Sequence, residues 1–104
     1  MLDTNVTVNN ERDQRYELVV DGRLAFSKYR RHGDEIVFMH TEVPEELEGR
    51  GIGSQLVRAA LDDVRAKGLR VIPRCPFVRA YIARHPEYLE IVDEAYREKT
   101  LHSA

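Results

Sequence analysis

The chain of 104 residues has a single cysteine, no long apolar run and almost no excess charge. One cysteine excludes an internal disulfide framework and fits a reducing compartment. No run approaches the roughly 20 apolar residues that span a bilayer, and residues 1–10 lack the basic and apolar regions of a secretory signal. We therefore expect a cytoplasmic protein with no membrane partner.

The charges nearly cancel, because 16 basic residues stand against 18 acidic ones, for a net charge of -2 and a pI near 6.1. No global field would draw the protein to nucleic acid, so any anion site must be local. The sequence also lacks a cluster of His, Cys, Asp and Glu with the spacing of metal ligands, and we predict no metal site.

Length and the absence of repeats or Pro/Gly/Ser linkers predict one compact domain over residues 1–104, acting as a monomer or weak dimer. We expect its first and last few residues, including the end of the tail, to fray.

Alternating and clustered apolar residues predict three antiparallel strands over 15–20, 23–31 and 35–43. Asp21-Gly22 lies between the first two runs and is a strong hairpin signal, because that turn needs positive φ at its central positions. The third run starts with successive apolar residues, which predicts a strand central in the sheet and covered on both faces.

Residues 52–67 have a helical apolar period that ends at Gly68, a typical C-terminal helix residue. A short strand over 69–73 follows, and then a helix over 77–85 that Pro86 stops. The order β-β-β-α-β-α predicts an α+β (mixed α/β) fold, a mixed sheet packed by two main helices.

Three glycines at alternate positions precede the first helix: Gly49, Gly51 and Gly53. A glycine turn that enters a helix offers free N–H groups and the positive end of the helix dipole to a phosphate. The same glycines also suit a tight loop and close packing. The Walker triplet is absent, and the dinucleotide fingerprint has one defect and follows a polar segment instead of a strand.

The segment "EGRGIG" over 48–53 matches both glycines of the acyl-CoA motif Gln/Arg-x-x-Gly-x-Gly/Ala. Together with "HTEVP", "GL-VIP-C" and "RHPEY" in that order, it resembles a minimal subfamily of the GNAT N-acetyltransferases. The resemblance implies a GNAT-like fold with splayed strands and acetyl-CoA as cosubstrate. It places the pyrophosphate on residues 50–54 and the pantetheine between two strands. The cofactor-binding residues that it implies are Thr41, Val43, Arg50, Gly51, Ile52, Gly53, Ser54 and Tyr81.

Acetyl transfer requires a neutral amine and a stabilised leaving thiolate. His40 is the candidate base, because histidine exchanges protons near neutral pH, and it shares a strand face with Glu42. Cys75 precedes a helix, a position that favours thiolate and would suit an acetyl-cysteine intermediate. The resemblance implies that this cysteine acts, and direct transfer to the amine is the alternative. Each also has a structural interpretation: His40 packed in a strand, and Cys75 a small buried residue or the lining of a thiol pocket.

Some alternatives stay open at this stage. Phe77, Tyr81 and His85 share a helix face, so core packing competes with a role for Tyr81 as the acid for the CoA thiol. Glu48 departs from the motif, and we expect it to turn outward or to pair with Arg50 or Arg74. The preferred function is transfer of an acetyl group to an unknown amine. The alternatives are a catalytically silent CoA-binding module and an unrelated nucleotide-phosphate binder.

Overall fold

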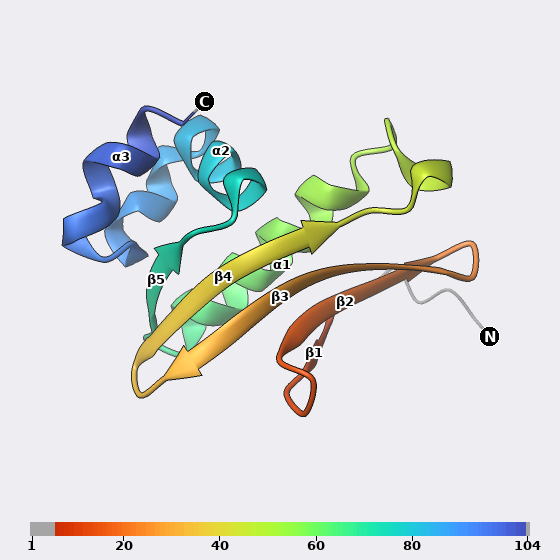
Figure 1. The fold of residues 1–104 in the computed structure, drawn as a ribbon, viewed down its shortest axis with the longest axis horizontal. Coiled ribbons are helices and arrows are strands. Elements are labelled where there is room, and N and C mark those ends of the chain that lie inside the picture. The colour runs from red at the N-terminus through yellow and green to blue at the C-terminus, as the bar shows by residue number, and fades with distance from the viewer. Residues whose placement is uncertain (1–5, 104) are drawn as a thin grey trace.

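The computed structural model describes residues 6–103 and has a five-stranded sheet in the order β1-β2-β3-β4-β5 (Figure 1). All neighbouring strands are antiparallel except β4 and β5, which are parallel. The predicted α+β class with a mixed sheet is therefore confirmed. The strands are β1 (Val8–Asn10), β2 (Arg15–Val20), β3 (Arg23–His32), β4 (Glu35–Glu42) and β5 (Arg70–Pro73).

The β2–β3 hairpin is the one that the sequence predicts. Val20 pairs with Arg23, which leaves Asp21 and Gly22 as a two-residue loop with φ of 52° and 72°. Positive φ at both loop positions gives a turn whose twist matches that of the strands. Strand β1 was not predicted; it adds three residues to the outer edge of β2.

Strand β4 contains a β-bulge. Tyr29 of β3 pairs with Phe38 and Lys28 pairs with His40, so Met39 is an extra residue in β4. Because strand side chains alternate between faces, one extra residue shifts every later side chain to the other face. The prediction that both faces of β4 are covered is wrong at Met39, which is 40% exposed.

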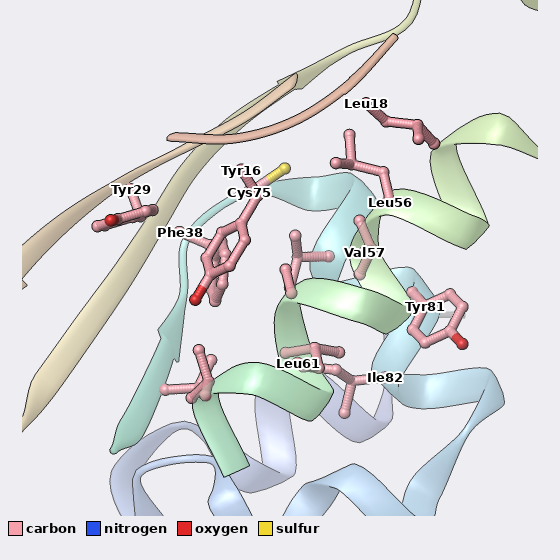
Figure 2. Packing of buried hydrophobic residues seen from close by; sticks show 14 of the residues in the cluster. Tyr16, Leu18, Tyr29, Phe38, Leu56, Val57, Leu61, Cys75, Tyr81 and Ile82 are labelled. Carbon is pink, nitrogen blue, oxygen red and sulfur yellow. The ribbon is translucent and has the colours of Figure 1, made fainter. Parts of the chain in front are cut away.

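Helix α1 (Ile52–Ala66) covers one face of the sheet, which we call the inner face. Its apolar side recurs at helical spacing and packs against alternate residues of β2, β3 and β4. Tyr16 of β2 donates from its Oη to Asp63 of α1 at 2.7 Å, which ties the sheet to the helix. Figure 2 shows this cluster between the sheet and α1. As predicted, Gly68 follows the helix with φ of 68°.

Strands β4 and β5 separate beyond one point. Their pairing ends at Phe38 and Pro73, and the Cys75 N–H then donates to the Phe38 carbonyl at 2.8 Å. The chain leaves the sheet there and enters α2 (Pro76–Arg84), whereas β4 continues to Glu42 (Figure 1). The residues of β4 after Phe38 therefore have β3 on one side and a gap on the other.

The tail differs from the prediction of a frayed end. Residues 86–91 and 94–96 form 3-10 turns, and α3 (Arg97–Leu101) follows with Thr100 fully buried. Fraying of the outermost residues falls outside the described part of the chain. Within residues 6–103, none of the helices has both the length and the apolar character needed to cross a bilayer.

Candidate functional site

A cavity of about 360 Å³ lies between the end of β4 and the start of α1. Its lining includes the glycine loop, the start of α1 and the end of β4. Six of the residues that the sequence predicts for cofactor binding line it: Thr41, Val43, Gly51, Ile52, Gly53 and Ser54. Leu47 and Phe77 add apolar surface, so the cavity combines the polar start of the helix with apolar side chains.

The polar end is the N-terminus of α1. Gly51 is the N-cap residue with φ of 74°, and its carbonyl accepts the first helical hydrogen bond, from the Gln55 N–H at 3.0 Å. The N–H groups of Ile52, Gly53 and Ser54 precede that bond and have no partner within the helix. The N-cap residue is a glycine and so provides no side-chain cap for them. Three adjacent donors at the positive end of a helix dipole form an anion site.

Gly53 makes a close contact with α2. A Cβ at this position would lie 2.6 Å from the Cζ of Phe77, closer than real Cβ contacts. Phe77 is 37% exposed, in contrast to the predicted core packing, and its ring borders the cavity. The missing side chain at Gly53 thus lets the two helices approach each other at the cavity.

Cys75 lies directly before α2 and is 2% exposed. Its Sγ is 3.3 Å from the Oγ1 of Thr41, which in turn is 3.0 Å from the Oγ of Ser27 on β3. Ser27 is fully buried. The three side chains form a polar chain across the inner face, within the apolar cluster in which Figure 2 shows Cys75. Cys75 does not itself line the cavity but contacts Thr41, which does.

The backbone of Thr41 faces the gap between β4 and β5. The Phe38 carbonyl points to the β5 side, and Tyr29 of β3, which pairs with Phe38, directs its N–H away from β4 to Gln14. By the alternation of antiparallel pairs, Lys28 and His40 then exchange hydrogen bonds, and Thr41 directs its N–H and C=O away from β3. Thr41 thus offers a hydroxyl to the inner face and an amide to the gap.

His40 lies on the opposite face from Thr41 and Cys75. Its Nε2 is 3.1 Å from the Oε2 of Glu42, which confirms that the two share a face, and its ring meets Phe26 edge-on. The side chains of His40 and Glu42 are 59% and 60% exposed. The structure therefore does not bring the two predicted catalytic residues, His40 and Cys75, to the same face of β4.

The loop charges are arranged differently from the expectation. Arg50 pairs through Nη1 with the Oδ2 of Asp21 at 2.7 Å, so its side chain is directed to the β2–β3 turn. It does not line the cavity. Glu48 does line it and is exposed, and the expected pairs with Arg50 and Arg74 are not formed among the described residues. The backbone amides, not Arg50, are the positive feature of this cavity.

Tyr81 lies in a second groove, between α1 and α2. Its ring stacks on His85 at 4.2 Å, and burial raises the pKa of Tyr81, so the phenol stays a hydrogen-bond donor. This groove, of about 450 Å³, also includes Arg58 and shares Ser54 with the first cavity. The predicted role of Tyr81 as an acid for the thiol is not supported by its position, since it does not line the cavity at Thr41.

Within residues 6–103, no group of three or more His, Cys, Asp and Glu side chains is placed to hold a metal ion.

Some residues of the site were not found from the sequence. Ser27 and Phe77 border Thr41 and Gly53, and neither was predicted to contribute to the site. A signal existed for Ser27, because it stands at an inward position between Ala25 and Tyr29. A hydroxyl at an inward strand position needs a partner, and here that partner is Thr41.

A mixed sheet whose parallel strands separate beside a glycine turn and a helix N-terminus is consistent with a GNAT-type N-acetyltransferase fold. A family model described as GCN5-related N-acetyl-transferase matches residues 15–92, more than half of the chain. The chain belongs to this family.

The chain is also similar to curated vertebrate proteins. It is 40% identical over 65 residues to Protein NATD1 of chicken (Gallus gallus) and of mouse (Mus musculus), a match that covers 60% of this chain and 59% of each relative. The human (Homo sapiens) Protein NATD1 matches at 40% over 65 residues and 58% of its length. The match thus spans less than two thirds of these relatives.

Proposed function

We propose that the protein transfers an acetyl group from acetyl-CoA to an amine, in the cavity at the end of β4. The observation that carries this proposal is the continuity of that cavity. It connects the free N–H groups at the start of α1 with Thr41, whose hydroxyl contacts Cys75 and whose amide faces the gap.

The cavity suits the two parts of a CoA molecule that differ most in polarity. The amides of Ile52, Gly53 and Ser54 would accept the pyrophosphate, since oriented backbone donors bind phosphate without a cationic side chain. The apolar lining from Val43, Leu47 and Phe77 would accept the pantetheine arm. Glu48 opposes the pyrophosphate and would have to keep its carboxylate outward.

The thioester carbonyl would then lie where β4 leaves β5. The gap-facing N–H of Thr41 is a preorganised donor for the carbonyl oxygen, which becomes an oxyanion in the transition state. The direction of that N–H follows from the pairing of β4 with β3.

Cys75 would take the acetyl group first. Its sulfur attacks the thioester carbon, the bond from that carbon to the CoA sulfur breaks, and the Cys75 proton passes to the departing CoA thiolate. Thr41 lies 3.3 Å from the sulfur and holds it by a hydrogen bond, with Ser27 fixing the Thr41 hydroxyl in turn.

The amine would approach from the outer face of β4, which carries His40. The neutral imidazole of His40 accepts a proton from the ammonium form, and Glu42, 3.1 Å away, stabilises the imidazolium that results. The free amine would then have to reach acetyl-Cys75 through the gap beside Thr41, where it attacks the acetyl carbon, the carbon–sulfur bond breaks, and the proton released by the amine returns to the sulfur.

Calorimetric titration with CoA, followed by a thiol-release assay with acetyl-CoA and a panel of polyamines and lysine peptides, tests this function. We expect CoA binding and amine-dependent release of thiol that is lost in Cys75→Ala. Binding without release by any amine would instead support a silent CoA-binding module. No binding of CoA would overturn the proposal.

A further inference from the structure

A third cavity lies on the other side of α2 from the proposed cofactor site. It measures about 240 Å³ and is bounded by the end of β5, by α2 and by α3. Phe77 lines the first cavity, and Arg79 lines this one two residues later, about 200° around the helix axis. The two cavities are therefore separate, and a ligand in one does not extend into the other.

The charged lining of this cavity is entirely positive. Arg79 contributes to it from α2, Lys99 from α3 and Arg74 from the segment between β5 and α2, and Pro73, Tyr96 and Thr100 complete it. The other cavities that involve the described residues differ in this respect. Asp62 accompanies Arg58 in the groove between α1 and α2, and both cavities around Arg70 also contain carboxylates.

None of the three cations is neutralised by the described part of the protein. Seven other basic residues pair with carboxylates there, but Arg74, Arg79 and Lys99 form no ion pair. The Nε of Arg79 is buried and has no hydrogen-bond partner. A buried guanidinium donor without an acceptor is costly, because its lost hydration is not replaced.

We infer that this cavity binds a tetrahedral oxyanion of the size of phosphate or sulfate, free or as the terminal group of a small ligand. Arginine presents paired donors that match phosphate oxygens, and lysine adds a point charge. A water molecule occupies about 30 Å³ in the liquid, so the cavity has room for the anion and a few waters. The missing acceptor for the Nε of Arg79 is then supplied by an anion oxygen.

The position of this site connects it to Cys75. Arg74 is the residue before Cys75, and the Arg79 N–H donates to the Cys75 carbonyl at 3.0 Å in the first turn of α2. An anion that binds both Arg74 and Arg79 would thus stabilise the start of α2, where the Cys75 sulfur lies. The inference itself does not depend on acetyl transfer.

Titration of the full chain with inorganic phosphate at constant ionic strength, with chloride as the comparison salt, tests this inference. Melting temperature and calorimetry report binding, because a ligand that binds only the native state stabilises it by an amount that grows with the ligand concentration relative to Kd. Variants of Arg79 and Lys99 distinguish this site from the N-terminus of α1, because neither residue lines the first cavity. Glycerol phosphate in a parallel titration distinguishes a free anion from an ester.

We expect phosphate to raise the melting temperature more than chloride does, and Arg79→Gln to weaken phosphate binding about tenfold. Lys99→Gln is the second variant, because its exposed side chain can be replaced without disturbing the fold. Arg30→Gln is the matched control: it removes the same charge from an exposed residue of β3 that forms no ion pair among the described residues. Equal effects of phosphate and chloride, or equal losses in Arg30→Gln and Lys99→Gln, would overturn the inference.

Discussion

The two faces of β4 beyond Phe38 carry different chemistry. On the inner face, the half-buried Thr41 joins the buried Ser27 and Cys75 in a polar chain. On the outer face, His40 and Glu42 form an exposed pair. Neighbouring residues of one strand thus lie in different surroundings: Thr41 contacts buried side chains, whereas His40 and Glu42 are exposed to solvent. The directions of the side chains thus explain the two roles that we propose: Cys75 on the inner face carries the acetyl group, and His40 on the outer face accepts the proton.

The bulge at Met39 creates this division. Without the extra residue, His40 would follow Phe38 onto the inner face and Thr41 would point outward. A single register shift therefore decides which of the two side chains meets Cys75. Substitutions on each face test this contrast, and the one with the largest expected effect comes first.

Removal of the outer-face base has the largest effect that we predict for one face alone. His40→Ala should lower the rate of transfer to the amine about 100-fold, because general base catalysis contributes at least that much. Acetylation of Cys75 should be unchanged, since His40 does not face the sulfur. Stopped-flow thiol release separates the two steps. The exposed His32→Ala serves as control, and an equal loss there, or a loss of Cys75 acetylation in His40→Ala, would contradict the assignment.

A methyl group at Gly53 tests whether CoA binds in the cavity that Gly53 and Thr41 line. Gly53→Ala should weaken CoA binding about tenfold, because the new Cβ would displace the Phe77 ring that borders the cavity. The free energy of unfolding should change by less than about 1 kcal/mol, since alanine favours the helix by a similar amount.

The double variant Gly53→Ala with Phe77→Ala is the control for this effect. Without the ring the methyl group has space, so CoA affinity should partly recover relative to Gly53→Ala. Calorimetric titration measures both. If the double variant binds CoA more weakly than either single variant, the clash is not the cause.

Loss of the Thr41 hydroxyl tests the polar chain of Ser27, Thr41 and Cys75 on the inner face. Thr41→Val keeps the shape of the side chain but leaves the buried Ser27 without this partner, which costs about 1 kcal/mol of stability. We expect acetylation of Cys75 to slow by about fivefold, in keeping with the loss of one hydrogen bond. Thr41→Ser should restore the rate, and a failure of serine to do so would mean that packing, not the hydroxyl, is responsible.

The hydrogen bond between Tyr88 and Asp62 has the smallest predicted effect on stability at neutral pH and a clear effect at high pH. Burial and the hydrogen bond that Tyr88 donates to Asp62 of α1 at 2.6 Å raise the pKa of Tyr88 to about 12. The pKa in the unfolded chain is about 10, so this contribution is complete below pH 10 and is lost as the pH rises through 12. Two pKa units correspond to about 2 to 3 kcal/mol.

Tyr88→Phe should therefore flatten the dependence of the unfolding free energy on pH between 10 and 12, measured by urea titration. Burial and Asp63 raise the pKa of Tyr16 as well, so part of the slope should remain. An unchanged slope in Tyr88→Phe would show that Tyr88 ionises as freely in the folded protein as in the unfolded chain. Acetyl transfer at neutral pH should be nearly unaffected, because neither face of β4 contains Tyr88.

Much of the fold could be predicted because local signals and the family resemblance agree. The Asp21-Gly22 turn, the period of α1 and the stop at Pro86 each have a local physical cause. Strand β1 carries little apolar character, and its pairing with β2 depends on tertiary context. The helical tail is held by the packing of residues such as Thr100. The polar sequence of this segment gives no local signal of that packing.

The site was predicted less completely. Its glycine loop follows from spacing, and six of the eight residues expected to bind the cofactor line the cavity, whereas Arg50 and Tyr81 do not. The bulge at Met39 has no local signal, so the face of His40 could not be read from a two-residue period. The pairing of Arg50 with Asp21 joins residues far apart in the sequence, which is why its direction away from the cavity was missed.

The most direct test of the two-face account is a time course of the intact protein mass, first with acetyl-CoA alone and then after addition of an amine. The account predicts that the wild type gains one acetyl group and loses it to the amine, that His40→Ala gains it but retains it, and that Cys75→Ser gains none. Amine acetylation by the wild type without any acetyl-protein, and at the same rate in Cys75→Ser, would contradict the account.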